Sequence, residues 1–220
     1  MMTTIARTFT GRGAYEETAN QWTHGIATVA AVYAAFELVE AVRGHADSWA
    51  LLGVHVYATS LVALYAASTL SHSFRLPRPR HFFRTVDQVC IFLLIVGTFT
   101  PVALVYLRDA FGLAILGAMW TLALVGIGLK LFVTGIRNVA VPFYVAVGWL
   151  PIVTLPRLFS SMDEISLAAT LAGGLFYTSG TYFLSIDRRV SYAHAVWHLF
   201  VVAGSACHYV VIFRNVVPVG

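Results

Sequence analysis

Long apolar stretches separated by short polar segments dominate the chain. Each stretch holds about 18 or more residues, which is enough for a helix to cross a hydrocarbon core of roughly 30 Å. The pattern predicts an all-α membrane protein, a bundle of seven transmembrane helices. The predicted spans lie near residues 22–42, 49–70, 86–107, 111–131, 139–156, 165–184 and 192–213.

The connections between the predicted spans are too short to hold a further domain, so residues 1–220 are expected to form a single membrane domain, with residues 1–21 as an N-terminal segment. The fifth span contains Pro142, Pro151 and Pro156. Proline is tolerated in a membrane helix when neighbouring helices satisfy the freed carbonyl groups. We expect a kink in this span.

The composition supports a membrane protein and argues against a soluble one. Hydrophobic residues make up 59% of the chain and charged residues 11%, whereas charged residues are about a quarter of a typical soluble domain. The first 20 residues contain no apolar core of a removable signal peptide, so the first span is expected to direct insertion. Cys90 and Cys207 both fall in apolar stretches and are interpreted as packing residues.

The basic residues predict an orientation. With seven spans, ten of the 14 Lys and Arg residues fall on the side that holds the N-terminus, and four fall on the other side. Short cytoplasmic segments of membrane proteins carry the excess of Lys and Arg. The N-terminus is therefore predicted to lie in the cytoplasm and the C-terminus outside, in a multi-pass protein of the inner (plasma) membrane. Orientation also explains the formal charge of +4 without a nucleic-acid partner.

Polar side chains that could bind a metal gather at one predicted depth. In the derived orientation, each lies at the cytoplasmic end of its span. Unrelated histidines that only fill the core would not be expected to share a depth, and ionisable groups inside a membrane usually have a function. The residues concerned are His24, Ser68, His72, Asp87, His194 and His198.

The spacing of the histidines favours a zinc site. His194 and His198 are four residues apart, so both rings lie on one helical face. With His72 they could provide three imidazole ligands, which is typical of a catalytic zinc ion with an open fourth position. Asp87 is then the candidate base. On spacing alone, two histidines bonded to neighbouring helices, and an aspartate paired with Arg84 and Arg75, remain alternatives.

Four motifs together resemble one known family. They are E-E-x-x-N-x-x-T-H-G at 16–25, S-x-x-x-H-S at 68–73, D-x-x-x-I-F-L-L-I-x-G-T-x-T-P at 87–101 and H-x-x-x-H-L-F-V-x-x-G-S-x-x-H at 194–208. The sequence resembles the bacterial hemolysin III family, relatives of the progestin and adiponectin receptors in the superfamily that includes the alkaline ceramidases. The resemblance covers all seven predicted spans.

The resemblance implies a Zn²⁺ cofactor near the cytoplasmic face, held by His72, His194 and His198. It also implies that Asp87 positions or deprotonates a water molecule and that Ser68 lies beside the site.

Three residues of the N-terminal motif lie on one face of the first helix, because Asn20 and His24 follow Glu17 by three and seven residues. They are expected either to contact the metal ligands or to cap the first span.

The leading interpretation is a zinc-dependent hydrolase of a lipid amide, similar to a ceramidase, with a membrane lipid as substrate. In that reaction Asp87 would act as the base, and Ser68 would donate a hydrogen bond to the developing oxyanion. The alternatives are a receptor or regulatory membrane protein with a structural zinc ion, or a cytolysin of the hemolysin III type. The oligomeric state does not follow from the sequence.

Overall fold

The computed structural model describes residues 11–44, 47–133 and 140–217, and this part of the chain is helical without strands. The elements are α1 Gly11–Val42, α2 Ser48–Ser73, α3 Pro77–Tyr106, α4 Ala110–Phe132, α5 Ala140–Trp149, the 3₁₀ helix η1 Leu150–Thr154, α6 Leu155–Leu158, α7 Glu164–Ile186 and α8 Ala193–Asn215. Residues 1–10 of the predicted N-terminal segment and residue 139 of the predicted fifth span lie outside the described residues.

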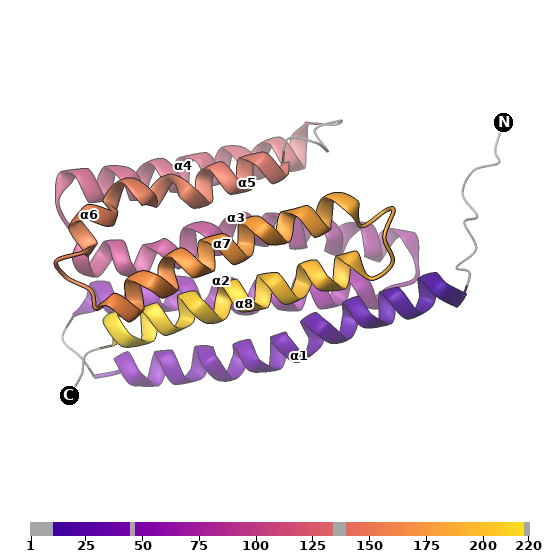
Figure 1. Ribbon diagram of the computed structural model, residues 1–220, viewed down its shortest axis with the longest axis horizontal. Coiled ribbons are helices and arrows are strands. Elements are labelled where there is room, and N and C mark those ends of the chain that lie inside the picture. Colours follow the sequence, from indigo (N-terminus) through magenta and orange to yellow (C-terminus); the bar gives the residue numbers. More distant parts are fainter. Residues whose placement is uncertain (1–10, 45–46, 134–139, 218–220) are drawn as a thin grey trace.

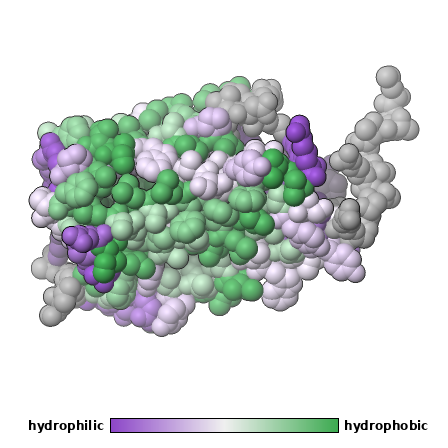
Figure 2. All heavy atoms as spheres, viewed as in Figure 1, coloured by the Kyte–Doolittle hydropathy of each residue, from purple (hydrophilic) through white to green (hydrophobic). Residues whose placement is uncertain are grey.

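The helices lie roughly parallel and antiparallel to one another along the long axis of the molecule (Figure 1). α1 begins at one end of the bundle, and α8 ends at the other. The visible face has a broad hydrophobic belt across its middle and hydrophilic residues toward both ends (Figure 2). Large side chains such as Trp22, Ile26 and Tyr33 are exposed on α1, at 64%, 66% and 66%. A belt of this kind is what a membrane-spanning bundle presents to lipid tails.

Helices occupy all seven predicted spans, but the described residues contain six helices that are long and apolar enough to cross a membrane. α7 is not among the six, although it has 23 residues. Its sequence is rich in Gly, Ser, Thr and Tyr, which lowers its hydropathy relative to the others. The protein is therefore a multi-pass membrane protein with at least these six candidate spans.

The fifth predicted span is interrupted where its prolines fall. α5 ends at Trp149, η1 follows with Pro151 in its first turn, and α6 has Pro156 in its first turn. Proline cannot donate a backbone hydrogen bond, so an α-helix changes form or ends at such a position. The kink that we expect in this span is present.

Close approach of α2 and α3 depends on two glycines. A Cβ atom at Gly53 would lie 2.5 Å from Pro101 Cα, and one at Gly97 would lie 3.1 Å from Ser60 Cβ. Small residues at such crossings let the backbones of membrane helices pack directly. The α2–α3 pair is thereby held rigidly, and it carries Ser68, His72 and Asp87.

Three aspartates at one end of the bundle both cap a helix and bind an arginine. Each precedes α2, α4 or α7 and accepts a hydrogen bond from a backbone amide of the first turn, which stabilises the helix start. The pKa of Asp163 lies below its ordinary value, because the amide of Ser166 and the guanidinium of Arg214 favour the carboxylate. The ion pairs at this "aspartate end" are Asp47 with Arg108, Asp109 with Arg157, and Asp163 with Arg214.

Candidate metal centre

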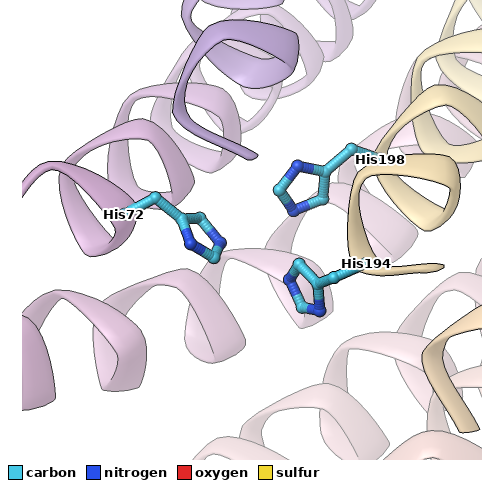
Figure 3. A group of neighbouring side chains, drawn as sticks. All are labelled: His72, His194 and His198. Atoms are coloured by element: carbon cyan, nitrogen blue, oxygen red, sulfur yellow. The ribbon is translucent and has the colours of Figure 1, made fainter. Parts of the chain in front are cut away.

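Three imidazoles meet at the opposite end of the bundle. His72 lies in the last turn of α2, and His194 and His198 lie in the first two turns of α8. One ligand atom from each ring lies within 4.8 Å of the others, and Figure 3 shows the three rings pointing toward one another. The cluster joins the second helix to the last, because their antiparallel arrangement brings the end of one beside the start of the other. These three residues could hold a metal ion.

Two of the rings are oriented by carboxylates. Nδ1 of His72 lies 2.7 Å from Oε2 of Glu17, and Nδ1 of His194 lies 3.0 Å from Oδ2 of Asp187. The other oxygen of Glu17 binds Arg80. A carboxylate only accepts hydrogen bonds, so the proton of each ring sits on Nδ1 and the lone pair of Nε2 is left free. Carboxylates that hold a metal-binding histidine in this way also raise its basicity.

A hydroxyl orients the third ring. Oγ1 of Thr23 lies 3.0 Å from Nδ1 of His198. The same hydroxyl reaches the backbone carbonyls of Ala19 and Asn20 at 3.0 and 2.9 Å, and these accept its hydrogen. The Thr23 oxygen is therefore the acceptor for the proton on His198 Nδ1. All three rings are thus in the tautomer that presents Nε2.

This donor set fits zinc. Three neutral imidazoles are ligands that zinc prefers, and they leave one position of a tetrahedral shell open. The rings of His72, His194 and His198 are inclined to one another by 61° to 74° and are not stacked, as expected for side chains that converge on a point.

Asp87 and Ser68 lie next to each other on α3 and α2. The Asp87 carboxyl interacts with the hydroxyl of Ser68 and with the charge of Arg84. Ser68 is 1% exposed, one helical turn before His72. The structure thus brings together the two residues that the sequence predicts as catalytic. Asp87 is not one of the three clustered ligands.

Asn20 and His24 are buried on the face of α1 that covers the cluster, at 6% and 3% exposure. The ring of His24 stacks on that of His198, with centroids 3.6 Å apart, and meets the edge of the Tyr65 ring at 5.0 Å. Both ring nitrogens of His24 and Oδ1 of Asn20 have no hydrogen-bond partner among the described residues. His24 therefore contacts a candidate ligand directly.

Comparison with known proteins identifies the family. Residues 13–209 match the family model described as "Haemolysin-III related". The chain belongs to the haemolysin-III family. It is 36% identical over 204 residues to Hemolysin-3 of Bacillus cereus, which covers 92% of this chain and 93% of that protein.

More distant relatives include a human protein. The Hemolysin-3 homolog of Bacillus subtilis (strain 168) is 33% identical over 192 residues, covering 87% of this chain and 90% of that protein. The human monocyte to macrophage differentiation factor is 30% identical over 215 residues, covering 91% and 84%. No solved structure matches the chain. The resemblance to the hemolysin III family is confirmed.

The haemolysin-III match includes residues of the site that sequence reasoning missed. Thr23, Asp187 and Arg80 contact candidate ligands or their partners, but they were not among the predicted site residues. Thr23 adjoins His24 in the first motif, and this adjacency is the one feature of the sequence that indicates a position of Thr23 near the site. Asp187 lies in the turn after α7 and Arg80 in the first turn of α3, each among other ionisable residues, and nothing in the sequence distinguishes them from solvated charges.

An apolar cavity of about 200 Å³ lies one helical turn from Ser68 and Asp87, and none of the three clustered histidines lines it. Its lining includes Trp197, the neighbour of His198, and Leu64 and Ile91, which lie one turn away from Ser68 and Asp87. It continues along α8 as far as Ile212. Fifteen residues of helix span about 22 Å. The cavity has the length and polarity to take the hydrocarbon chain of a lipid.

Proposed function

We propose that this haemolysin-III protein is a zinc-dependent hydrolase of a membrane lipid, acting on an amide bond. One observation carries the proposal: three imidazoles, each with Nδ1 held by a partner, converge on one point, and Trp197, which adjoins His198 in the chain, lines an apolar cavity as long as a lipid chain. His72, His194 and His198 would hold the zinc ion. A zinc ion in such a setting polarises a carbonyl group and activates water for attack on it.

Asp87 is the residue that we assign to proton transfer. During hydrolysis a bond forms between the water oxygen and the carbonyl carbon, and the bond from that carbon to nitrogen breaks. The Asp87 carboxylate accepts the proton that the water loses and delivers it to the departing nitrogen, so the products are a carboxylic acid and an amine.

Ser68 is best suited to orient Asp87. Its hydroxyl interacts with the Asp87 carboxyl, and its burial keeps water from competing for that carboxyl. A hydroxyl engaged in this way supports Asp87 more directly than it would support an oxyanion. The role that we propose for Ser68 is therefore positioning, in place of the oxyanion contact considered from the sequence.

The cavity supports a lipid as substrate. Its walls are mostly aliphatic and aromatic, and they include Trp197, which adjoins His198 in the chain. A lipid whose polar linkage reached the histidines would place its hydrocarbon chain between α3, α5, α7 and α8. Burial of that chain would supply binding energy of about 0.8 kcal/mol for each CH₂ group.

The proposal includes the seven-span topology with a cytoplasmic N-terminus. α7 runs antiparallel beside α8 and has the same length of 23 residues, which supports a crossing by both (Figure 1). In this topology the excess of Lys and Arg on the side of the N-terminus supports a histidine cluster at the cytoplasmic face of the inner membrane.

The test combines metal analysis with a hydrolysis assay on purified protein. We expect one zinc per wild-type chain, loss of zinc in the His194→Ala, His198→Ala variant, and release of fatty acid from a panel of ceramides and other N-acyl lipids. Asp87→Asn should retain zinc and lose fatty-acid release by at least about 100-fold. Absence of metal from folded wild-type protein would refute the site. Zinc without fatty-acid release would refute the hydrolase and favour a regulatory protein with structural zinc.

A further inference from the structure

A groove of about 650 Å³ opens between the start of α3 and the end of α4, and none of the clustered histidines lines it. Its walls are almost entirely apolar, and Arg78 and His81 contribute to them chiefly through their carbon atoms. The residues used below are Arg78, His81, Phe82, Val86, Val89 and Leu131. The groove is open at the surface, and Phe82 and Leu131 are 61% and 51% exposed.

The length of α3 places the groove across the boundary of the membrane. Its 30 residues span about 45 Å, whereas the hydrocarbon core is only about 30 Å thick. The first turns of α3 therefore lie in the head-group layer. Arg78 and His81 belong to these turns, and Val86 and Val89 lie further along, toward the lipid tails. The groove thus joins a basic region at phosphate depth to an apolar region at chain depth.

Arg78 is the guanidinium available for a ligand here. Glu17 of α1 binds Arg80 and His72. Among the described residues, no Asp or Glu pairs with Arg78. The helix start itself contributes little, because Pro77 and Pro79 have no N–H group and the amide of Arg80 donates to Leu76. Recognition in this groove must therefore come from side chains.

We propose that the groove binds one anionic phospholipid. Its phosphate would lie against Arg78 and His81, and one acyl chain would follow Phe82, Val86, Val89 and Leu131. Basic pockets between helices near the cytoplasmic side are suited to acidic head groups. A zwitterionic lipid could fill the apolar part equally well, but its own ammonium group would oppose the positive charge at the rim. This proposal does not depend on the metal site.

Native mass spectrometry of the full-length protein in mild detergent tests the proposal. The protein is titrated with phosphatidylglycerol and with phosphatidylethanolamine of identical chains. We expect one phosphatidylglycerol to be retained with a preference of roughly fivefold or more over phosphatidylethanolamine. Arg78→Gln should abolish the preference. Arg75→Gln is the matched control, because it removes the same charge in the loop just before α3, at a residue that does not line the groove.

A second variant tests the apolar part of the groove. Val89→Trp keeps both basic side chains and fills the space for the chain, so it should reduce phosphatidylglycerol retention by a similar factor. Equal retention of the two lipids by the wild type would overturn the proposal. An equal loss in Arg75→Gln and Arg78→Gln would also overturn it, because general charge attraction would then account for the binding. Thermal unfolding of each variant verifies that it is folded.

Discussion

Replacement of Glu17 by glutamine is expected to weaken zinc binding although Glu17 is not itself a proposed ligand. Glu17 accepts a hydrogen bond from Nδ1 of His72 at 2.7 Å and also binds Arg80. Glutamine has nearly the same size but no negative charge. The charge is what supports the proton on Nδ1 and increases the electron density on Nε2, which faces the proposed ion.

The expected loss of zinc affinity is large for a substitution outside the proposed ligands. Removing such a partner costs about 10- to 100-fold in metal affinity, or about 1.4 to 2.8 kcal/mol. The His72 side chain is 2% exposed and that of Glu17 is 24% exposed. Water therefore screens their interaction only weakly, and we expect the loss to fall in the upper part of this range.

Competition with a chromophoric chelator in detergent measures the zinc affinity. Glu16→Gln is the matched control, because it removes the same charge one residue earlier, at a side chain with no ion pair among the described residues. Circular dichroism of the zinc-free proteins verifies equal helix content. A zinc affinity of Glu17→Gln within twofold of the wild type would refute the reasoning. So would an equal loss in the Glu16→Gln control.

Three further predictions use thermal unfolding as the measurement. Removal of zinc by a chelator should lower the melting temperature reversibly in the wild type and have no effect in His194→Ala, because a ligand at 100 times its Kd stabilises by about 2.7 kcal/mol. Gly53→Ala should lower the melting temperature, since the added Cβ would press on the α3 backbone. Gly117→Ala should leave the melting temperature unchanged or raise it, because an added Cβ there meets no atom within 4 Å. Asp163→Asn should lower the melting temperature at neutral pH. Because the native pKa of Asp163 is lowered by a backbone amide and by Arg214, this difference should disappear as the pH falls below about 3.9 and through the native pKa.

The histidine cluster could be anticipated because two independent features of the sequence agree. The i and i+4 spacing of His194 and His198 places both on one face whatever the rotation of the helix. The common depth of His72 then follows from the alternating direction of the spans. Neither argument needs a packing geometry, so both could be made from the sequence.

The contacts of Thr23 and Asp187 could not be anticipated in the same way. Which face of α1 meets α8 depends on helix rotation, and the apolar pattern of a membrane helix barely constrains rotation when lipid and protein interior are equally apolar. The exposed apolar side chains Trp22 and Ile26 illustrate this, because they resemble core residues in sequence but lie on the surface. The position of Asp187 depends on the conformation of a turn.

The participation of α1 in the histidine cluster has a consequence for biosynthesis. Glu17 and Thr23 come from the helix that leaves the ribosome first, and His194 and His198 come from the one that leaves it last. Until α8 is inserted, Thr23 has no imidazole to orient, and only one of the three candidate ligands has been made. Capture of the proposed metal ion would thereby be delayed until α8 is in place. A chain that stalled before α8 would therefore lack two of the three candidate ligands.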